Sequence, residues 1–170
     1  QLTLAPVIAA IAAGNCALIK PSEHAEATAK VFEKHLVNYL DSAAFKVITG
    51  GVEVSQQLTE LPFDHIFYTG GPQAAKAIMA AAAKNLTPVT LELGGKSPAV
   101  VLSDADITVT ARRIVWGKYL NAGQTCIAPD YLLVEESMKD RLIDALREQI
   151  AQFYGDDPQQ SNDYGRIIHE

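Results

Sequence analysis

A cysteine in a small, polar loop is the residue of this sequence best suited to covalent chemistry. Cys126 ends the segment Asn121-Ala-Gly-Gln-Thr-Cys126, directly after a stretch of helical character. A loop cysteine is more accessible than a core cysteine as the thiolate, the nucleophilic form of the side chain. The alternative is a structural cysteine, because free cysteine is among the most buried residue types. Cys16, inside an apolar strand pattern, fits that alternative directly.

A carboxylate interrupts an otherwise apolar strand pattern, Val89-Thr-Leu-Glu-Leu-Gly-Gly95. A strand buried on both faces should be apolar throughout. Glu92 must therefore be paired, protonated or positioned for proton transfer. The alternative to proton transfer is a buried ion pair, with Lys96 or with an arginine of a helix.

Two further segments could hold a nucleotide. Lys20-Pro-Ser-Glu23 places a cation and an anion at the end of a strand, where they suit hydroxyls or phosphates, although Ser22 or Glu23 could simply cap the next helix. Gly70-Gly-Pro72 offers backbone N–H groups at a helix N-terminus, which favours an anion. The sequence contains neither GxGxxG nor GxxxxGK[ST], so an ordinary dinucleotide fingerprint and a P-loop are absent.

The elements that must position these residues alternate between strands and helices. The apolar patterns predict strands at 16–20, 45–49, 65–69 and 89–93, with helices at 24–40, 54–61 and 72–84 between them. In the first of these helices, the residues expected to face the core are Val31, Phe32, Leu36, Val37 and Leu40. Such alternation indicates βαβ units and a mostly parallel sheet, whose ligand site lies beyond the carboxyl ends of the strands. Lys20, Thr69 and Glu92 fall there.

After Ser97 the spacing of the apolar segments changes. The patterns predict a strand at 99–102, a helix at 107–120, a strand at 131–134, an amphipathic helix at 137–153 and a surface loop at 155–163. The last helix is expected to turn Leu142, Ile143, Leu146 and Ile150 inward. We place a domain boundary between residues 96 and 97.

Composition excludes several classes of protein. The 170 residues are 48% hydrophobic and carry a net charge of −6, from 14 basic and 20 acidic residues scattered along the chain. A nucleic-acid partner is not expected, because there is no basic face. The longest apolar stretch, residues 4–13, is too short for a bilayer span, and the first residues show no basic-then-apolar pattern, so we expect a soluble protein. Two distant cysteines argue against a disulfide framework or a structural zinc site, and we expect no metal and a cytoplasmic location.

Four motifs, in this order, resemble the NAD(P)-dependent aldehyde dehydrogenase superfamily: Lys20-Pro-Ser-Glu23, Phe67-Tyr-Thr-Gly70, Leu91-Glu-Leu-Gly-Gly-Lys-Ser-Pro98 and Gly123-Gln-Thr-Cys126. Three further segments look most like the class 3 and coniferyl-aldehyde branch: Leu86-Thr-Pro-Val-Thr90, Cys126-Ile-Ala-Pro-Asp-Tyr131 and Asp163-Tyr-Gly-Arg-Ile-Ile168. The resemblance covers nearly the whole chain. It implies an α/β fold: a Rossmann-like, mostly parallel sheet in residues 1–96, part of an NAD(P)-binding domain, and the start of a second α/β catalytic domain in residues 97–170.

The resemblance also implies the chemistry. Cys126 would attack an aldehyde carbon to give a thiohemiacetal, hydride would pass to NAD or NADP, and water would hydrolyse the resulting thioester. Glu92 matches the family's general base. The positions that match cofactor contacts are Lys20 and Glu23 at the adenosine ribose, Gly70 and Gly71 near the pyrophosphate, and Leu93 and Gly94. The partners implied are a small-molecule aldehyde and, for the full-length parent, further copies of itself in a homodimer or larger homo-oligomer.

Two departures from the family pattern stand out. The family turn usually reads Gly-Ser-Thr-x-x-Gly, whereas Pro72 here removes an N–H donor and Ala75 adds a methyl group. The family's catalytic asparagine lies just before the position of Gln1, so we expect an internal fragment that has no dehydrogenase activity alone. The alternatives are a cysteine-dependent acyl-thioester hydrolase or acyltransferase, and a non-catalytic folding or assembly module.

Overall fold

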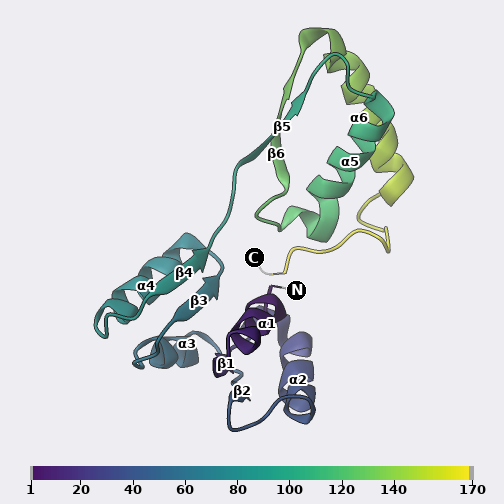
Figure 1. Ribbon diagram of the computed structural model, residues 1–170. Coiled ribbons are helices and arrows are strands. Elements are labelled where there is room, and N and C mark those ends of the chain that lie inside the picture. Colours follow the sequence, from purple (N-terminus) through teal and green to yellow (C-terminus); the bar gives the residue numbers. More distant parts are fainter. Residues whose placement is uncertain (1, 169–170) are drawn as a thin grey trace. The chain divides into compact units, whose positions relative to one another are not determined.

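The computed structural model describes residues 2–168 and divides into two compact units, residues 2–93 and residues 94–168. In both units the strands pair in parallel, joined by helices (Figure 1). This is the mixed α/β architecture that the alternating pattern predicts.

The first unit contains two parallel strand pairs. Its elements, in chain order, are α1 (Leu4–Ala12), β1 (Ala17–Ile19), the 3₁₀ turn η1 (Glu23–Ala25), α2 (Glu26–His35), the 3₁₀ turn η2 (Leu36–Asn38), β2 (Phe45–Val47), α3 (Val52–Thr59), β3 (Ile66–Thr69), α4 (Pro72–Ala83) and β4 (Val89–Glu92). Strand β1 pairs with β2, and β3 pairs with β4. The register places Thr69 opposite Glu92, so both of these strands end at the same level.

Local sequence explains where the helices of this unit begin. The Ser22 hydroxyl accepts a hydrogen bond from the His24 N–H at 3.3 Å and so caps the turn η1. Gly71 is the N-cap of α4, and Pro72 occupies its first helical position, where a missing N–H removes no intrahelical bond. Buried Ala75, Ile78 and Ala82 then hold α4 in the core of the unit.

The second unit is built around one parallel pair. Its elements are β5 (Ser97–Val101), α5 (Ile107–Tyr119), the 3₁₀ segment η3 (Leu120–Gly123), β6 (Pro129–Val134), the 3₁₀ turn η4 (Glu136–Met138) and α6 (Lys139–Tyr154). Asp106 caps α5, since its Oδ1 accepts from the Val109 N–H at 2.9 Å. Val101, Ala111 and Leu142 form the buried centre of the unit, with Leu132 and Val134 packed against it.

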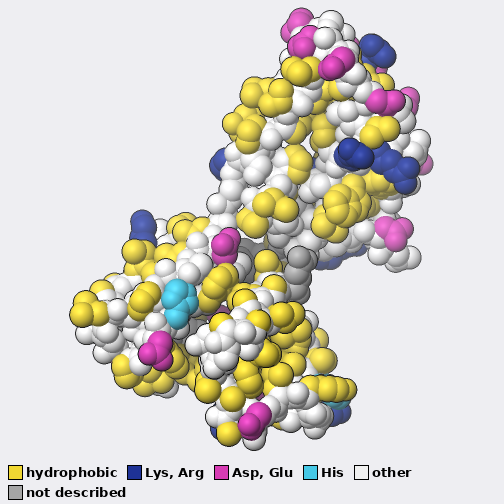
Figure 2. Space-filling view, viewed as in Figure 1, with side chains coloured by type: hydrophobic (Ala, Val, Ile, Leu, Met, Phe, Trp, Pro, Cys, Tyr) yellow, Lys and Arg dark blue, Asp and Glu magenta, His cyan; other side chains and the backbone are white. Residues whose placement is uncertain are grey.

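The outward face of the β5–β6 pair is also apolar. Val100 and Leu133 lie opposite each other in the register, and both side chains are exposed. Figure 2 shows apolar side chains gathered on the surface of this unit. Within the described chain, the β5–β6 pair therefore has one face packed on helices and one face open.

Several details differ from the sequence-based expectations. Residues 4–13 were expected only to be too short for a membrane span, yet most of them form α1. The expected helix 24–40 is α2 flanked by two 3₁₀ turns, and Val31 and Val37 are exposed. Ile143 is also exposed, while Gln149 takes an inward position on α6 and donates to Gln152 Oε1 at 2.9 Å. Cys16 is exposed and precedes β1, so the expectation that it is buried is wrong.

None of the helices within residues 2–168 is long and apolar enough to cross a membrane.

Two neighbouring residues on α6 give a direct test of the core of the second unit. Leu142 is 1% exposed and Ile143 38% exposed. We expect Leu142→Ala to lower the free energy of unfolding by about 2–5 kcal/mol, because it leaves a cavity in the core. Ile143→Ala should cost at most about 1 kcal/mol. Urea denaturation of both variants measures the difference, and equal losses would show that the core is placed wrongly.

Candidate active site

Cys126 lies in a tight turn between α5 and β6, and its side chain is exposed. The turn begins with three consecutive residues whose backbone is left-handed. They are Asn121, Ala122 and Gly123, with φ of 55°, 55° and 78°. Non-glycine residues adopt this conformation only at a cost, so contacts elsewhere must hold the segment in place. The Thr125 N–H donates to the Gly123 carbonyl at 2.9 Å, and the Ala128 N–H donates to the Thr125 carbonyl at 3.1 Å.

The backbone of Cys126 passes directly against Gly95. A Cβ atom added at Gly95 would overlap the Cys126 carbonyl oxygen, whereas one added at Gly94 would meet nothing within 4 Å. Parallel pairing explains the approach, because Gly95 and Cys126 precede β5 and β6, which pair from Ser97 and Pro129 onward. The second glycine of the Gly94-Gly95 pair is therefore required by the position of the cysteine turn.

A charged group lies where this turn joins β6. The register shifts between Ser97 and Pro98, which leaves Asp130 unpaired between Pro129 and Tyr131. The Asp130 carboxylate lies 3.3 Å from Lys96 Nζ and 3.9 Å from Lys118 Nζ. Both lysines are solvent-accessible, so these pairs contribute little stability. They orient Asp130 at the base of the turn.

Glu92 is the last residue of β4, and its side chain is exposed. Its backbone carbonyl accepts from the Gly70 N–H at 3.0 Å, which ties the ends of β3 and β4 together. No salt bridge reaches its carboxylate within residues 2–168, and Lys96 pairs with Asp130 instead. The expected burial of Glu92 and the alternative ion pair with Lys96 are both wrong. Glu92 belongs to the first unit, and Cys126 belongs to the second.

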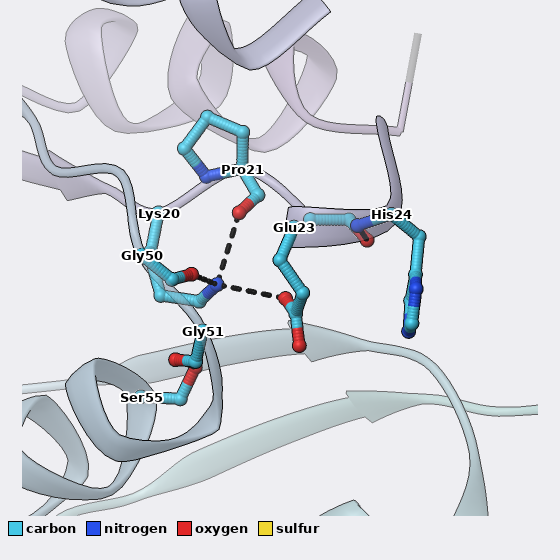
Figure 3. Close-up of polar contacts among 8 residues, drawn as sticks. Lys20, Pro21, Glu23, His24, Gly50, Gly51 and Ser55 are labelled. Atoms are coloured by element: carbon cyan, nitrogen blue, oxygen red, sulfur yellow. Dashed lines mark hydrogen bonds and ion pairs between the residues drawn. The ribbon is translucent and has the colours of Figure 1, made fainter. Parts of the chain in front are cut away.

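Lys20 and Glu23 meet at the carboxyl ends of β1 and β2 (Figure 3). Lys20 Nζ donates to the Pro21 and Gly50 carbonyls, both at 3.0 Å, and to Glu23 Oε2 at 3.2 Å. All three ammonium protons therefore have an acceptor. The backbone N–H of Glu23 is the largest cause that holds the pKa of its carboxyl below the usual value, and Lys20 adds to this against a raising effect of burial. The contact with Lys20 therefore holds the Glu23 carboxylate in one position.

The turn after β3 leaves open space at one glycine. A Cβ added at Gly71 would meet nothing within 4 Å, while one added at Gly70 would overlap the Tyr68 side chain. The N–H groups in the first turn of α4 have no intrahelical partners at this position. Pro72 is the exception, because proline carries no N–H group. Ala75 is 2% exposed, so its methyl group packs inside the unit. This end of α4 fits an anionic group such as a pyrophosphate.

The two remaining predicted cofactor contacts lie where the units join in sequence. Leu93 is half-buried and follows β4, and Gly94 is exposed. No group of three or more potential metal ligands occurs in the part of the chain that the structure describes.

Three residues of this region had no role in the sequence analysis: Gly95, Asp130 and Gln124. All three stand within quoted motifs, but the contacts of Gly95 and Gln124 lie far along the chain, where spacing gives no signal. The Gln124 amide contacts backbone at Arg166 and Ile168. The available signal for Gln124 was a polar amide side chain directly after Gly123 and two residues before Cys126.

Gly95→Ala and Gly94→Ala form a matched pair. We expect Gly95→Ala to lower the free energy of unfolding by about 1–3 kcal/mol, because the new methyl group forces the Cys126 backbone to move. Gly94→Ala should be close to neutral, since the space beside it is open. Urea denaturation measures both. A neutral Gly95→Ala would contradict the close approach of the two segments.

Comparisons with a family model and with known proteins all find aldehyde dehydrogenases. The model of the aldehyde dehydrogenase family matches residues 1–170. Aldehyde dehydrogenase family 3 member A2 of Pongo abelii is 54% identical over 168 residues, which are 99% of this chain and 35% of that protein. Aldehyde dehydrogenase family 3 member B1 of Mus musculus is 52% identical over 170 residues, 100% of this chain and 36% of that protein.

Solved structures agree. The substrate-bound Staphylococcus aureus AldH superposes with a TM-score of 0.89 at 50% identity, over 99% of this chain and 37% of that one. An indole-3-acetaldehyde dehydrogenase complexed with NAD+ gives a TM-score of 0.82 at 30% identity, over 98% of this chain and 34% of that one. The chain spans about a third of the length of the relatives that it matches.

Proposed function

Because the chain belongs to the aldehyde dehydrogenase family, we propose that it supplies the nucleophile, the base and part of the cofactor site for oxidation of an aldehyde to a carboxylic acid. Relatives of family 3 at 52–54% identity agree with the predicted class 3 resemblance. The activity is proposed for a protein of the relatives' full length that contains this chain, since the chain spans about a third of them.

Cys126 is the proposed nucleophile. The observation that carries this role is its exposure at the centre of a turn whose backbone is fixed from two sides, by Gly95 and by the hydrogen bonds of residues 123–128. The thiolate adds to the aldehyde carbon and forms a C–S bond, which gives a tetrahedral thiohemiacetal. Loss of hydride from that carbon leaves a thioester on Cys126, and water then breaks the C–S bond to release the acid and restore the thiol.

Glu92 is the proposed base for activating the thiol or the hydrolytic water. Its carboxylate is exposed and has no salt bridge within residues 2–168, so it is available to accept a proton. Water attacking the thioester must lose a proton, and a carboxylate that accepts this proton lowers the barrier to its loss.

NAD or NADP is the proposed cofactor, and when bound it accepts the hydride. Glu23, held by Lys20, can accept hydrogen bonds from ribose hydroxyls. A hydroxyl that bonds Lys20 must replace one of its three present acceptors. Gly71 leaves open space for the pyrophosphate at the N-terminus of α4, and Gly70, Leu93 and Gly94 are the remaining proposed contacts.

Replacement of Cys126 tests the nucleophile. In the full-length protein we expect Cys126→Ser or Cys126→Ala to nearly abolish aldehyde-dependent NAD(P)H formation, because an unactivated serine is a poor nucleophile. Cys16→Ser is the matched control, since Cys16 is also exposed. Oxidation near the wild-type rate in both Cys126 variants would refute the proposal. Ester or thioester turnover without NAD(P)H formation would favour an acyl-transfer enzyme instead.

Replacement of Glu92 by Gln tests the base. The amide keeps the shape and loses the proton acceptor, so we expect thioester hydrolysis to slow by about 10²–10⁴-fold. The acyl group should then accumulate on Cys126, where mass spectrometry of the intact protein detects it. Because Glu92 is exposed, the melting temperature should hardly change. Normal turnover with a lower melting temperature would mean that Glu92 is only structural.

A further inference from the structure

The side chain of Gln124 joins the cysteine turn to a distant stretch of chain. We call residues 155–168, which follow α6 and are yellow in Figure 1, the strap. Gln124 Nε2 donates to the Asn121 carbonyl at 2.9 Å and to the Arg166 carbonyl at 3.0 Å. Gln124 Oε1 accepts from the Ile168 N–H at 3.0 Å. One amide thus holds both the turn and the strap.

These contacts need a primary amide of this length. Both N–H groups of Nε2 donate to carbonyl oxygens, and the amide oxygen accepts from an N–H. A carboxylate of the same size has no donor and would place negative charge beside two carbonyl oxygens. The Asn121 side chain closes the turn from the other direction, since its Nδ2 donates to the Gln124 carbonyl at 3.2 Å.

The strap is itself anchored in the second unit. The Tyr164 ring packs edge-on against Tyr154 and Tyr119, with ring centroids 5.1 and 6.2 Å apart. Burial, with Tyr164 and Tyr119 nearby, raises the pKa of the Tyr154 hydroxyl above its usual value. The strap therefore has its own hold on α5 and α6 and does not depend on Gln124 alone.

Within the strap, one guanidinium organises the backbone. Arg166 donates to the carbonyls of Gln159 at 2.7 Å, Tyr164 at 2.6 Å and Gly165 at 3.0 Å. Gly165 lies against the turn itself, because a Cβ added there would stand 3.4 Å from the Ala122 nitrogen. The Arg166 carbonyl and the Ile168 N–H, which Gln124 contacts, therefore belong to a folded segment.

We propose that Gln124 is a positioning residue, which fixes the Cys126 thiol for attack by binding its turn to the strap. The inference rests on the function proposed for Cys126. Three left-handed residues precede Gln124, and such a backbone persists only where surrounding contacts over-determine it. Gln124 supplies those contacts two residues before the thiol.

Replacement of Gln124 by Ala in the full-length protein is the first test. We expect kcat for aldehyde oxidation to fall by about 10²-fold, as a misplaced reacting group does. The KM for NAD(P) should stay unchanged, because the proposed cofactor contacts belong to other segments. Gln160→Ala is the matched control: Gln160 lies on the strap, and its side chain makes no hydrogen bond within the described residues. Wild-type kcat in Gln124→Ala would overturn the proposal.

A second variant isolates the two donors. Gln124→Glu keeps the size and the acceptor but loses the bonds to the Asn121 and Arg166 carbonyls. We expect it to lose as much kcat as Gln124→Ala. A wild-type kcat in Gln124→Glu would mean that these donors do not hold the turn, which would also overturn the proposal.

Counting active sites separates positioning from simple loss of folded protein. Alkylation of Cys126 by iodoacetamide, quantified on the peptide that contains it, counts the accessible thiols. Positioning predicts full alkylation with slow turnover per thiol, and loss of hydrogen-exchange protection at the Ile168 amide. A reduced number of thiols with normal turnover per thiol would show a structural role only. If Cys126→Ala keeps aldehyde oxidation, the proposed function fails first, whatever Gln124 variants do.

Discussion

Parallel pairing of short strands is the constraint on which the rest of this structure depends. Two paired parallel strands start and end at the same level, so residues that flank them in sequence meet in space. In the first unit this brings together the residues that follow the strands: Lys20 reaches the Gly50 carbonyl, and the Gly70 N–H reaches Glu92. In the second unit it brings together the residues that precede them, Gly95 and Cys126. The cysteine therefore lies at the amino end of its strand pair, whereas the nucleotide-site candidates lie at carboxyl ends.

Most of the secondary structure could be predicted from local sequence. Alternating apolar runs, the Pro21-Ser22 capping signal and the Gly71-Pro72 helix start located the strands and helices to within a few residues. Periodicity was less reliable for burial. Val31 and Ile143 fit an inward stripe by their spacing, yet both side chains are exposed within the described residues.

The candidate site was only partly predictable, for a physical reason. Cys126 and Lys20 stand out by residue type and place in the sequence. Gly95 and Gln124 matter through backbone contacts with partners about 30 to 44 positions away, and no local pattern encodes such contacts. Glu92 was expected in a buried setting because its strand is apolar, but it occupies the last, exposed position of that strand.

The attachment of the cysteine turn to the strap also sets an order of events during synthesis. Gln124 contacts backbone 42 and 44 positions further along the chain, so its partners do not exist when Cys126 is first made. At roughly 5–20 residues per second, translation takes roughly 2–9 s to reach Ile168. The residues of β5, α5 and β6 all precede the strap and are synthesised before it. The hydrogen bonds from Gln124 to the strap can therefore form only after Arg166 and Ile168 have been synthesised.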